Sequence, residues 1–141
     1  MLLHPQLAET LLDADCATLA FDATTLKGTH VNTIYFSTPD GILSASVQEV
    51  LGARAEDYLA HITDVIDEIA TAYALFSKRD IDSVISDIAA VIKSTLTDRV
   101  STNHATIVLL EAMLNEKLLE LNCNVHPLDS ISSVCREALK T

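Results

Sequence analysis

The first part of the chain carries short apolar runs and alternating apolar and polar residues, and both patterns favour β-strands. Residues 17–22, ATLAFD, form an apolar run that ends on the carboxylate of Asp22. Two more strands are predicted at residues 29–37 and 42–50. Between them, residues 38–41, TPDG, supply the proline, aspartate and glycine of a tight hairpin. The three strands are predicted to form an antiparallel meander.

The third predicted strand has one apolar and one polar face. Because side chains alternate along a strand, Leu43, Ala45 and Val47 are expected on the apolar face. Ser44 and Ser46 are expected on the other face, in contact with water. A strand with one wet face is predicted to lie at the edge of the sheet.

Beyond residue 52 the apolar residues recur at intervals of three and four, as in amphipathic helices. Helices are predicted over residues 53–76 and 81–92. A third is predicted from a cap at Ser101 or Thr102 to Leu121, and a last one begins at a cap at Asp129 or Ser130. Short strands are predicted at residues 93–98 and 122–128. Residues 1–16 are predicted to form a helical lead-in to one domain over residues 17–141. The predicted order is three strands followed by helices that alternate with two further strands.

The composition favours a small domain with an aliphatic core. The chain has 141 residues, of which 49% are hydrophobic and only 4% aromatic. No apolar run approaches the roughly 20 residues of a membrane span, and the first residues lack the features of a signal peptide. Three cysteines without paired spacing favour reduced thiols. The sequence therefore predicts a soluble intracellular protein that does not contact a membrane.

The charge balance is strongly acidic. The net charge is −11, from 20 acidic against 9 basic residues. A domain that binds nucleic acid by itself normally carries a basic patch, and this sequence shows no such cluster of lysine and arginine. Contact with DNA would therefore need bound metal ions, additional domains or other subunits.

The predicted order of elements is that of the ribonuclease H fold, an α/β fold with a five-stranded mixed sheet flanked by helices. In that fold the first and fourth strands are parallel neighbours, so Asp22 and Asp98 would meet at the carboxyl edge of the sheet. Two adjacent carboxylates repel each other unless a cation lies between them, and Mg²⁺ prefers oxygen ligands. The residues alone leave a second interpretation open, in which both aspartates cap strand ends.

Three short stretches resemble the catalytic core of hAT-type transposases. They are residues 21–25, FDATT; residues 97–99, TDR, with Asn103 five positions after the acid; and residues 123–126, CNVH. The resemblance spans about residues 17–128 in order and spacing. It implies a transposon-derived protein with metal-dependent cleavage and strand transfer of DNA, a Mg²⁺ or Mn²⁺ cofactor and a nuclear location, and it leaves a homo-oligomer open.

By this resemblance, Asp22 and Asp98 are the first two metal-binding acids of an Asp-Asp-Glu triad. The family places its glutamate on a helix after the fifth strand, usually beyond a large inserted helical domain. No such insertion precedes the last predicted helix here, where Glu137 is the candidate third acid and a surface acid is the alternative. Asp129 is better explained as a helix cap.

The resemblance leaves three functional hypotheses. The first is a metal-dependent DNA-cleaving core, although the isolated chain is expected to bind metal weakly and not to cut DNA. The second is a non-catalytic interaction domain of the same fold. The third is an unrelated acidic α/β protein.

The cysteine and histidine residues predict no zinc site. Cys123 and His126 could be zinc ligands, but a closed structural site needs four ligands and no second pair has suitable spacing. A packed strand residue and a hydrogen-bonded histidine are the favoured interpretation. His104 is expected to face either Asp98 or solvent, and no pattern predicts a role for His61.

Overall fold

The computed structural model describes residues 4–98, 101–123 and 138. Its elements are, in chain order, α1 (His4–Asp13), β1 (Ala17–Leu26), β2 (Thr29–Thr38), β3 (Gly41–Val50), α2 (Ala55–Ser77), α3 (Ile81–Val91), β4 (Ile92–Asp98), α4 (Ser101–Leu114) and β5 (Leu119–Cys123). None of the helices within the described residues is long and apolar enough to cross a membrane.

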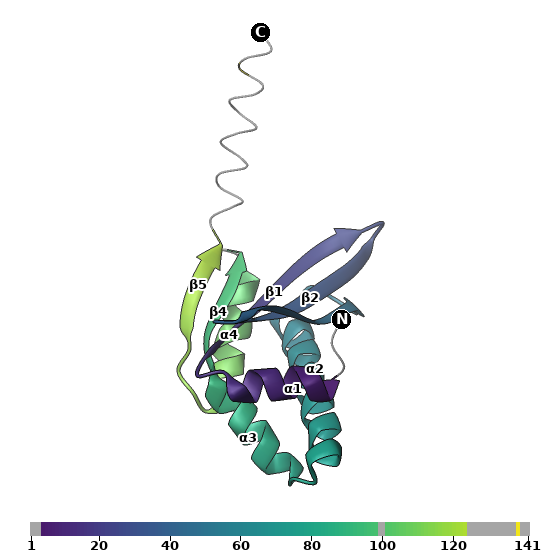
Figure 1. The fold of residues 1–141 in the computed structure, drawn as a ribbon. Coiled ribbons are helices and arrows are strands. Elements are labelled where there is room, and N and C mark those ends of the chain that lie inside the picture. The colour runs from purple at the N-terminus through teal and green to yellow at the C-terminus, as the bar shows by residue number, and fades with distance from the viewer. Residues whose placement is uncertain (1–3, 99–100, 124–137, 139–141) are drawn as a thin grey trace.

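The strands form one five-stranded mixed sheet in the order β3-β2-β1-β4-β5 (Figure 1). Strand β2 is antiparallel to both β1 and β3, whereas β4 runs parallel to β1 and β5 runs parallel to β4. The predicted α/β class, the antiparallel meander and the position of the fourth strand beside the first are confirmed.

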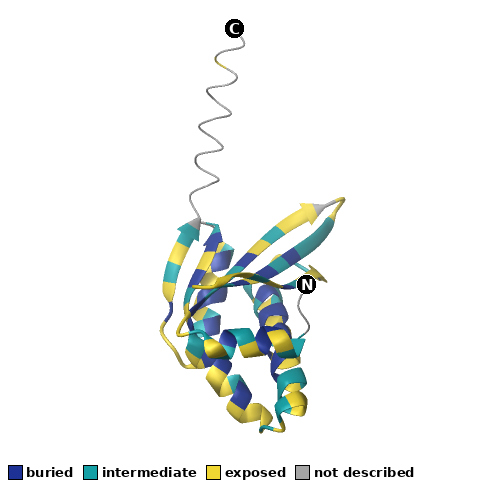
Figure 2. Ribbon diagram, in the orientation of Figure 1, coloured by how far each residue is buried: buried dark blue, intermediate teal, exposed yellow. Residues whose placement is uncertain are grey.

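In the described part of the chain, the helices cover one face of this sheet. Alternate side chains of the central strands are buried on that face, among them Leu19 and Phe21 of β1 and Ile34 and Phe36 of β2. They share one core with apolar residues of all four helices, namely Leu7, Leu11, Ile62, Ile66, Ile69, Val84, Ile88, Ile107 and Leu110. The intervening side chains lie on the opposite face and remain partly or fully exposed (Figure 2).

Two tight turns set the register of the meander. In the turn between β1 and β2, Lys27 and Gly28 both have positive φ angles, 51° and 79°, as a two-residue hairpin turn of type I′ requires. In the second turn Thr38 pairs with Gly41. The Oγ1 atom of Thr38 accepts a hydrogen bond of 3.2 Å from the backbone N–H of Asp40. Both predicted hairpins are therefore present.

A β-bulge corrects the predicted faces of the third strand. Ile34 pairs with Ser46 and the next residue, Tyr35, pairs with Ser44, so Ala45 is an extra residue on β3. Because this extra residue shifts the alternation by one, Ser46 turns toward the helices and Val47 turns outward. The prediction that Val47 shares the apolar face is wrong, since its exposed fraction is 61%.

Helix α4 ends earlier than the spacing of its apolar residues predicts. A helix reaching Leu121 was expected, but α4 ends at Leu114 because Asn115 adopts a left-handed conformation with φ 54°. The Glu111 carboxylate then accepts a hydrogen bond of 2.9 Å from the backbone N–H of Leu118. As a result β5 begins at Leu119, three residues before the predicted start.

The last predicted helix lies almost wholly outside the described residues. Residues 124–137, with Asp129 and Glu137 among them, are not described. Ala138 is described as helical and exposed, whereas the apolar spacing predicts that it faces inward.

The core supports a stability prediction with a matched control. Phe36 is fully buried, so Phe36→Ala should lower the free energy of unfolding by about 3–5 kcal/mol through lost burial and a cavity. The spacing of apolar residues in the helix predicts Phe76 on its apolar face, but this side chain is 71% exposed, so Phe76→Ala should change stability by less than about 0.5 kcal/mol. Urea unfolding measures both values, and equal losses would contradict this assignment of the core.

Candidate functional site

The candidate site begins where the pairing between β1 and β4 ends. The ladder runs through Thr18↔Ser94 and Leu19↔Thr95 to Ala20↔Leu96. Asp22 and Asp98 each lie two residues beyond this last pair. Because side chains alternate along a strand, both aspartates lie on the same face of the sheet as Ala20 and Leu96.

That face is the one opposite the helices. Phe21 and Thr97, the residues just before the two aspartates, are buried on the helix-covered face. Asp22 is exposed and Asp98 is half-buried. The two carboxylates therefore lie on the open face, where ionised groups keep contact with water.

The two aspartates line one cavity of about 350 Å³. Its walls come from β1, β2, β3 and β4, with the lining residues Ala20, Phe21, Asp22, Tyr35, Ser37, Ile42, Leu96, Thr97 and Asp98. Figure 1 shows the β1–β2 hairpin and the β4–β5 pair pointing away from each other beyond this region. The cavity therefore lies at the fork where the sheet opens.

Asn103 holds the end of β4 in place. Its side-chain amide donates a hydrogen bond of 3.2 Å to the backbone carbonyl of Asp98, and Asn103 is itself only 8% exposed. The hydroxyl of Thr97 donates a second hydrogen bond of 3.2 Å to the same carbonyl. Asn103, which belongs to the motif that follows the second acid, is thus a positioning residue that fixes the backbone of Asp98.

Of the remaining candidates from the sequence, the structure describes the side chain of His104, which does not line this cavity. The Nδ1 atom of His104 lies 2.7 Å from a carboxylate oxygen of Glu120, so this histidine pairs with β5. The backbone of Cys123 pairs with Asp98 in the sheet. The side chain of Cys123, and the whole of His126 and Glu137, lie outside what the structure describes.

The donor chemistry of the cavity fits a magnesium or manganese ion. Asp22 and Asp98 offer carboxylate oxygens, and Mg²⁺ typically uses one or two protein carboxylates while it keeps several waters. Within residues 4–98 and 101–123, no group of three or more His, Cys, Asp or Glu side chains is placed to hold a metal. Asp22 and Asp98 are therefore the described residues that could hold such an ion, and two carboxylates alone predict weak affinity.

A buried polar cluster was missed in the sequence. The ring of His61, only 1% exposed, lies between Asn32 and Ser46, with Nδ1 2.9 Å from the Asn32 amide nitrogen and Nε2 2.9 Å from the Ser46 hydroxyl. Hydrogen-bonded serine and histidine side chains also occur in hydrolases, but this imidazole is closed off from any substrate. We therefore assign the cluster a structural role, in which it ties α2 to β2 and β3.

The comparisons with known proteins leave the resemblance to transposases as a prediction. No protein-family model matches the chain, and no curated protein matches it. The sequence likeness rests on the residues quoted above, and the geometry of the cavity is independent of it.

The buried histidine predicts a pH-dependent stability. Burial lowers the pKa of His61 from its ordinary value of 6.5, against the opposing effect of Asp64 and Glu68. Below about pH 6.5 the unfolded chain therefore binds a proton at His61 more readily than the folded chain does. The free energy of unfolding should fall as the pH drops through this range.

The measurement is urea unfolding at several pH values between about pH 7.5 and pH 5.5. In His61→Gln the free energy of unfolding should be lower at the upper pH by about 1–3 kcal/mol, because buried partners lose hydrogen bonds. It should also vary less with pH than in the unmodified chain. An equally steep pH dependence in both proteins would contradict the role given to His61.

Proposed function

We propose that this chain is a transposase-derived domain of ribonuclease H type in which Asp22 and Asp98 bind Mg²⁺ or Mn²⁺ for phosphodiester chemistry on DNA. One observation carries the proposal: both carboxylates line one cavity on one face of the sheet. They do so although 76 positions separate them in the chain. The strand order, with β4 parallel to β1, supports it.

Each residue of the site has a distinct task in this proposal. Asp22 and Asp98 would hold the cation, and Asn103 keeps the backbone of Asp98 in position. A bound divalent ion would supply activation of an attacking hydroxyl and stabilisation of the leaving oxygen. Glu137 is the proposed third ligand, by resemblance only.

The charge of the chain limits what the domain does by itself. Its net charge of −11 repels a DNA backbone, and the described residues that line the cavity include no lysine or arginine. We therefore propose that DNA reaches the site through additional domains or subunits, in the nucleus. The 141-residue chain alone should bind the cation and leave DNA uncut.

The walls of the cavity favour a second candidate function, a non-catalytic interaction domain. Ile42 is 75% exposed, Leu96 38% and Tyr35 37%, so much of the open face around the acids is apolar. Apolar surface that remains in contact with water often marks a site of protein association. In this alternative, Asp22 and Asp98 are polar residues of β1 and β4 beside a docking surface.

Metal binding tests the proposed site directly. The affinity of the whole chain for manganese can be measured by electron paramagnetic resonance. Asp22→Asn and Asp98→Asn should each weaken this affinity roughly tenfold or more, and a tenfold loss corresponds to about 1.4 kcal/mol of binding free energy. Asp40→Asn, at the exposed hairpin turn, is the matched control and should leave the affinity unchanged. If all three variants bind manganese equally, the cavity is not a metal site.

DNA cleavage tests whether the domain is catalytic by itself. We expect no nicking when the chain is incubated with Mn²⁺ and supercoiled plasmid, because two carboxylates and an acidic surface hold neither the ion nor the DNA firmly. Nicking that disappears in Asp22→Asn and Asp98→Asn would instead show that the domain is catalytic alone. Glu137→Gln would then test the third ligand, and unchanged nicking in that variant would remove it.

A further inference from the structure

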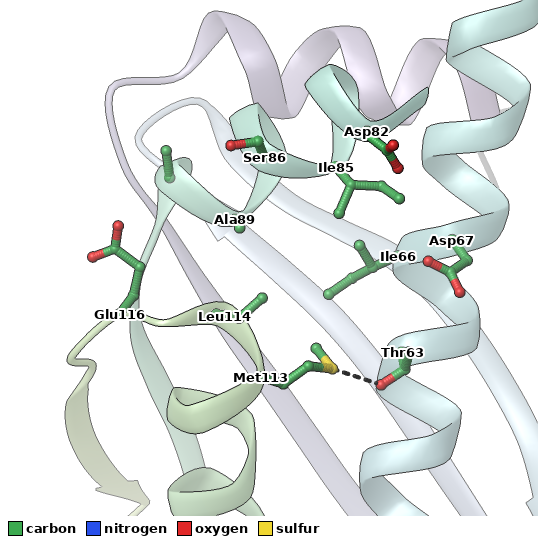
Figure 3. Close-up of a pocket in the computed structure, with 11 residues that line it drawn as sticks. Thr63, Ile66, Asp67, Asp82, Ile85, Ser86, Ala89, Met113, Leu114 and Glu116 are labelled. Atoms are coloured by element: carbon green, nitrogen blue, oxygen red, sulfur yellow. Dashed lines mark hydrogen bonds between the residues drawn. The ribbon is translucent and has the colours of Figure 1, made fainter. Parts of the chain in front are cut away.

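A second cavity, of about 420 Å³, lies between α2, α3 and the end of α4. Among the described residues, it shares no lining residue with the cavity at Asp22 and Asp98. Figure 3 shows an apolar floor between two acidic rims, with Asp67 and Asp82 on one side and Glu116 on the other. We call this cavity the three-helix groove.

The floor of the groove is apolar and adaptable. It is made by Ile66 of α2, Ile85 of α3, and Met113 and Leu114 of α4. Met113 is 41% exposed, and its sulfur accepts a hydrogen bond of 3.1 Å from the hydroxyl of Thr63 across the groove. Methionine is common at surfaces that adjust to bound side chains, since it is flexible and polarizable. Such a floor suits the apolar side chains of a partner.

The rims carry negative charge that the described residues do not neutralise. Within residues 4–98 and 101–123, none of the three rim carboxylates takes part in an ion pair. Nearby acids differ, because Asp87 pairs with Arg79 and Glu111 with Lys117. The uncompensated rim charge therefore complements a cationic ligand.

We propose that the three-helix groove binds a basic amphipathic helix of a partner protein. Leucine-like side chains of that helix would lie on the floor, and its lysine or arginine side chains would pair with Asp67, Asp82 and Glu116. An amphipathic helix in an apolar groove is a common mode of peptide recognition, and charges at the rim fix its orientation. The acidic rim disfavours nucleic acid, whose phosphates it repels.

The test uses the whole chain and a synthetic probe peptide. The probe is an amidated, fluorescently labelled helix of leucine and lysine, about 15 residues long so that it can become helical, with leucine at helical spacing on one face. One control peptide has the same composition in scrambled order, and another has glutamate in place of lysine. Fluorescence anisotropy should show binding of the probe and much weaker binding of both controls.

Charge reversal in the groove needs a control of equal net charge. The variant Asp67→Lys, Asp82→Lys, Glu116→Lys should weaken binding of the probe roughly tenfold or more, as expected for the loss of paired charges at an interface. The control variant Asp40→Lys, Glu49→Lys, Glu56→Lys changes exposed acids elsewhere by the same total charge and should change the affinity by less than about threefold. Equal losses in both variants would overturn the proposal, because general attraction to an acidic protein would then explain the binding.

A steric variant tests the groove without a change in charge. Ala90 is exposed and lines the groove, so Ala90→Trp should fill the space and abolish binding of the probe while the chain stays folded. Asp22→Asn should leave this binding intact, which separates the groove from the proposed metal site. Equal binding of the scrambled peptide would overturn the proposal. The proposal would also be overturned if the chain did not bind the probe but associated with itself through the rim acids, because a second copy of the chain would then be the occupant.

Discussion

The parallel pairing of β1 with β4 is the interaction on which the candidate site depends. It joins segments that lie far apart in the chain, and a hydrogen bond of 2.7 Å between the hydroxyls of Thr18 and Ser94 reinforces it. The end of this ladder decides where the two strands separate. Because Asp22 and Asp98 both come two residues later, their place at one fork follows from the register of a single strand pair.

The unequal coverage of the sheet explains how the apolar strand β1 can carry a carboxylate at Asp22, inside a strand that continues to Leu26. Phe21 faces the helices and is buried, whereas Asp22 faces the open side and is exposed. An isolated ionised carboxylate is costly to bury, so a sheet covered on both faces would have required a partner at this position. Because Asp22 stays in contact with water on the open face, this cost does not arise here.

Local chemistry made much of the fold predictable. The turns at Lys27-Gly28 and at residues 38–41 define the meander, and apolar spacing predicts α2 closely. Two errors arise where one residue interrupts a regular spacing: Ala45 forms a bulge, and Asn115 ends a helix whose apolar spacing continues. The placement of Asp22 and Asp98 at one cavity was predictable from the strand order, but the expectation that the first strand ends on Asp22 was wrong, because β1 continues to Leu26. His61 was not, because its partners lie on other elements and leave no periodic signal.

The acidity of the chain has two different physical meanings in this structure. At the fork of the sheet, two carboxylates line one cavity, and a directly bound ion is the counter-charge that we propose there. Along the three-helix groove the acids are spread over two rims above an apolar floor, which suits the separated charges of a peptide. Salt distinguishes these cases, since ions screen exposed charges over about 8 Å at physiological strength but compete poorly with direct coordination. The surplus of negative charge is therefore better understood from the place of each acid than from the net value.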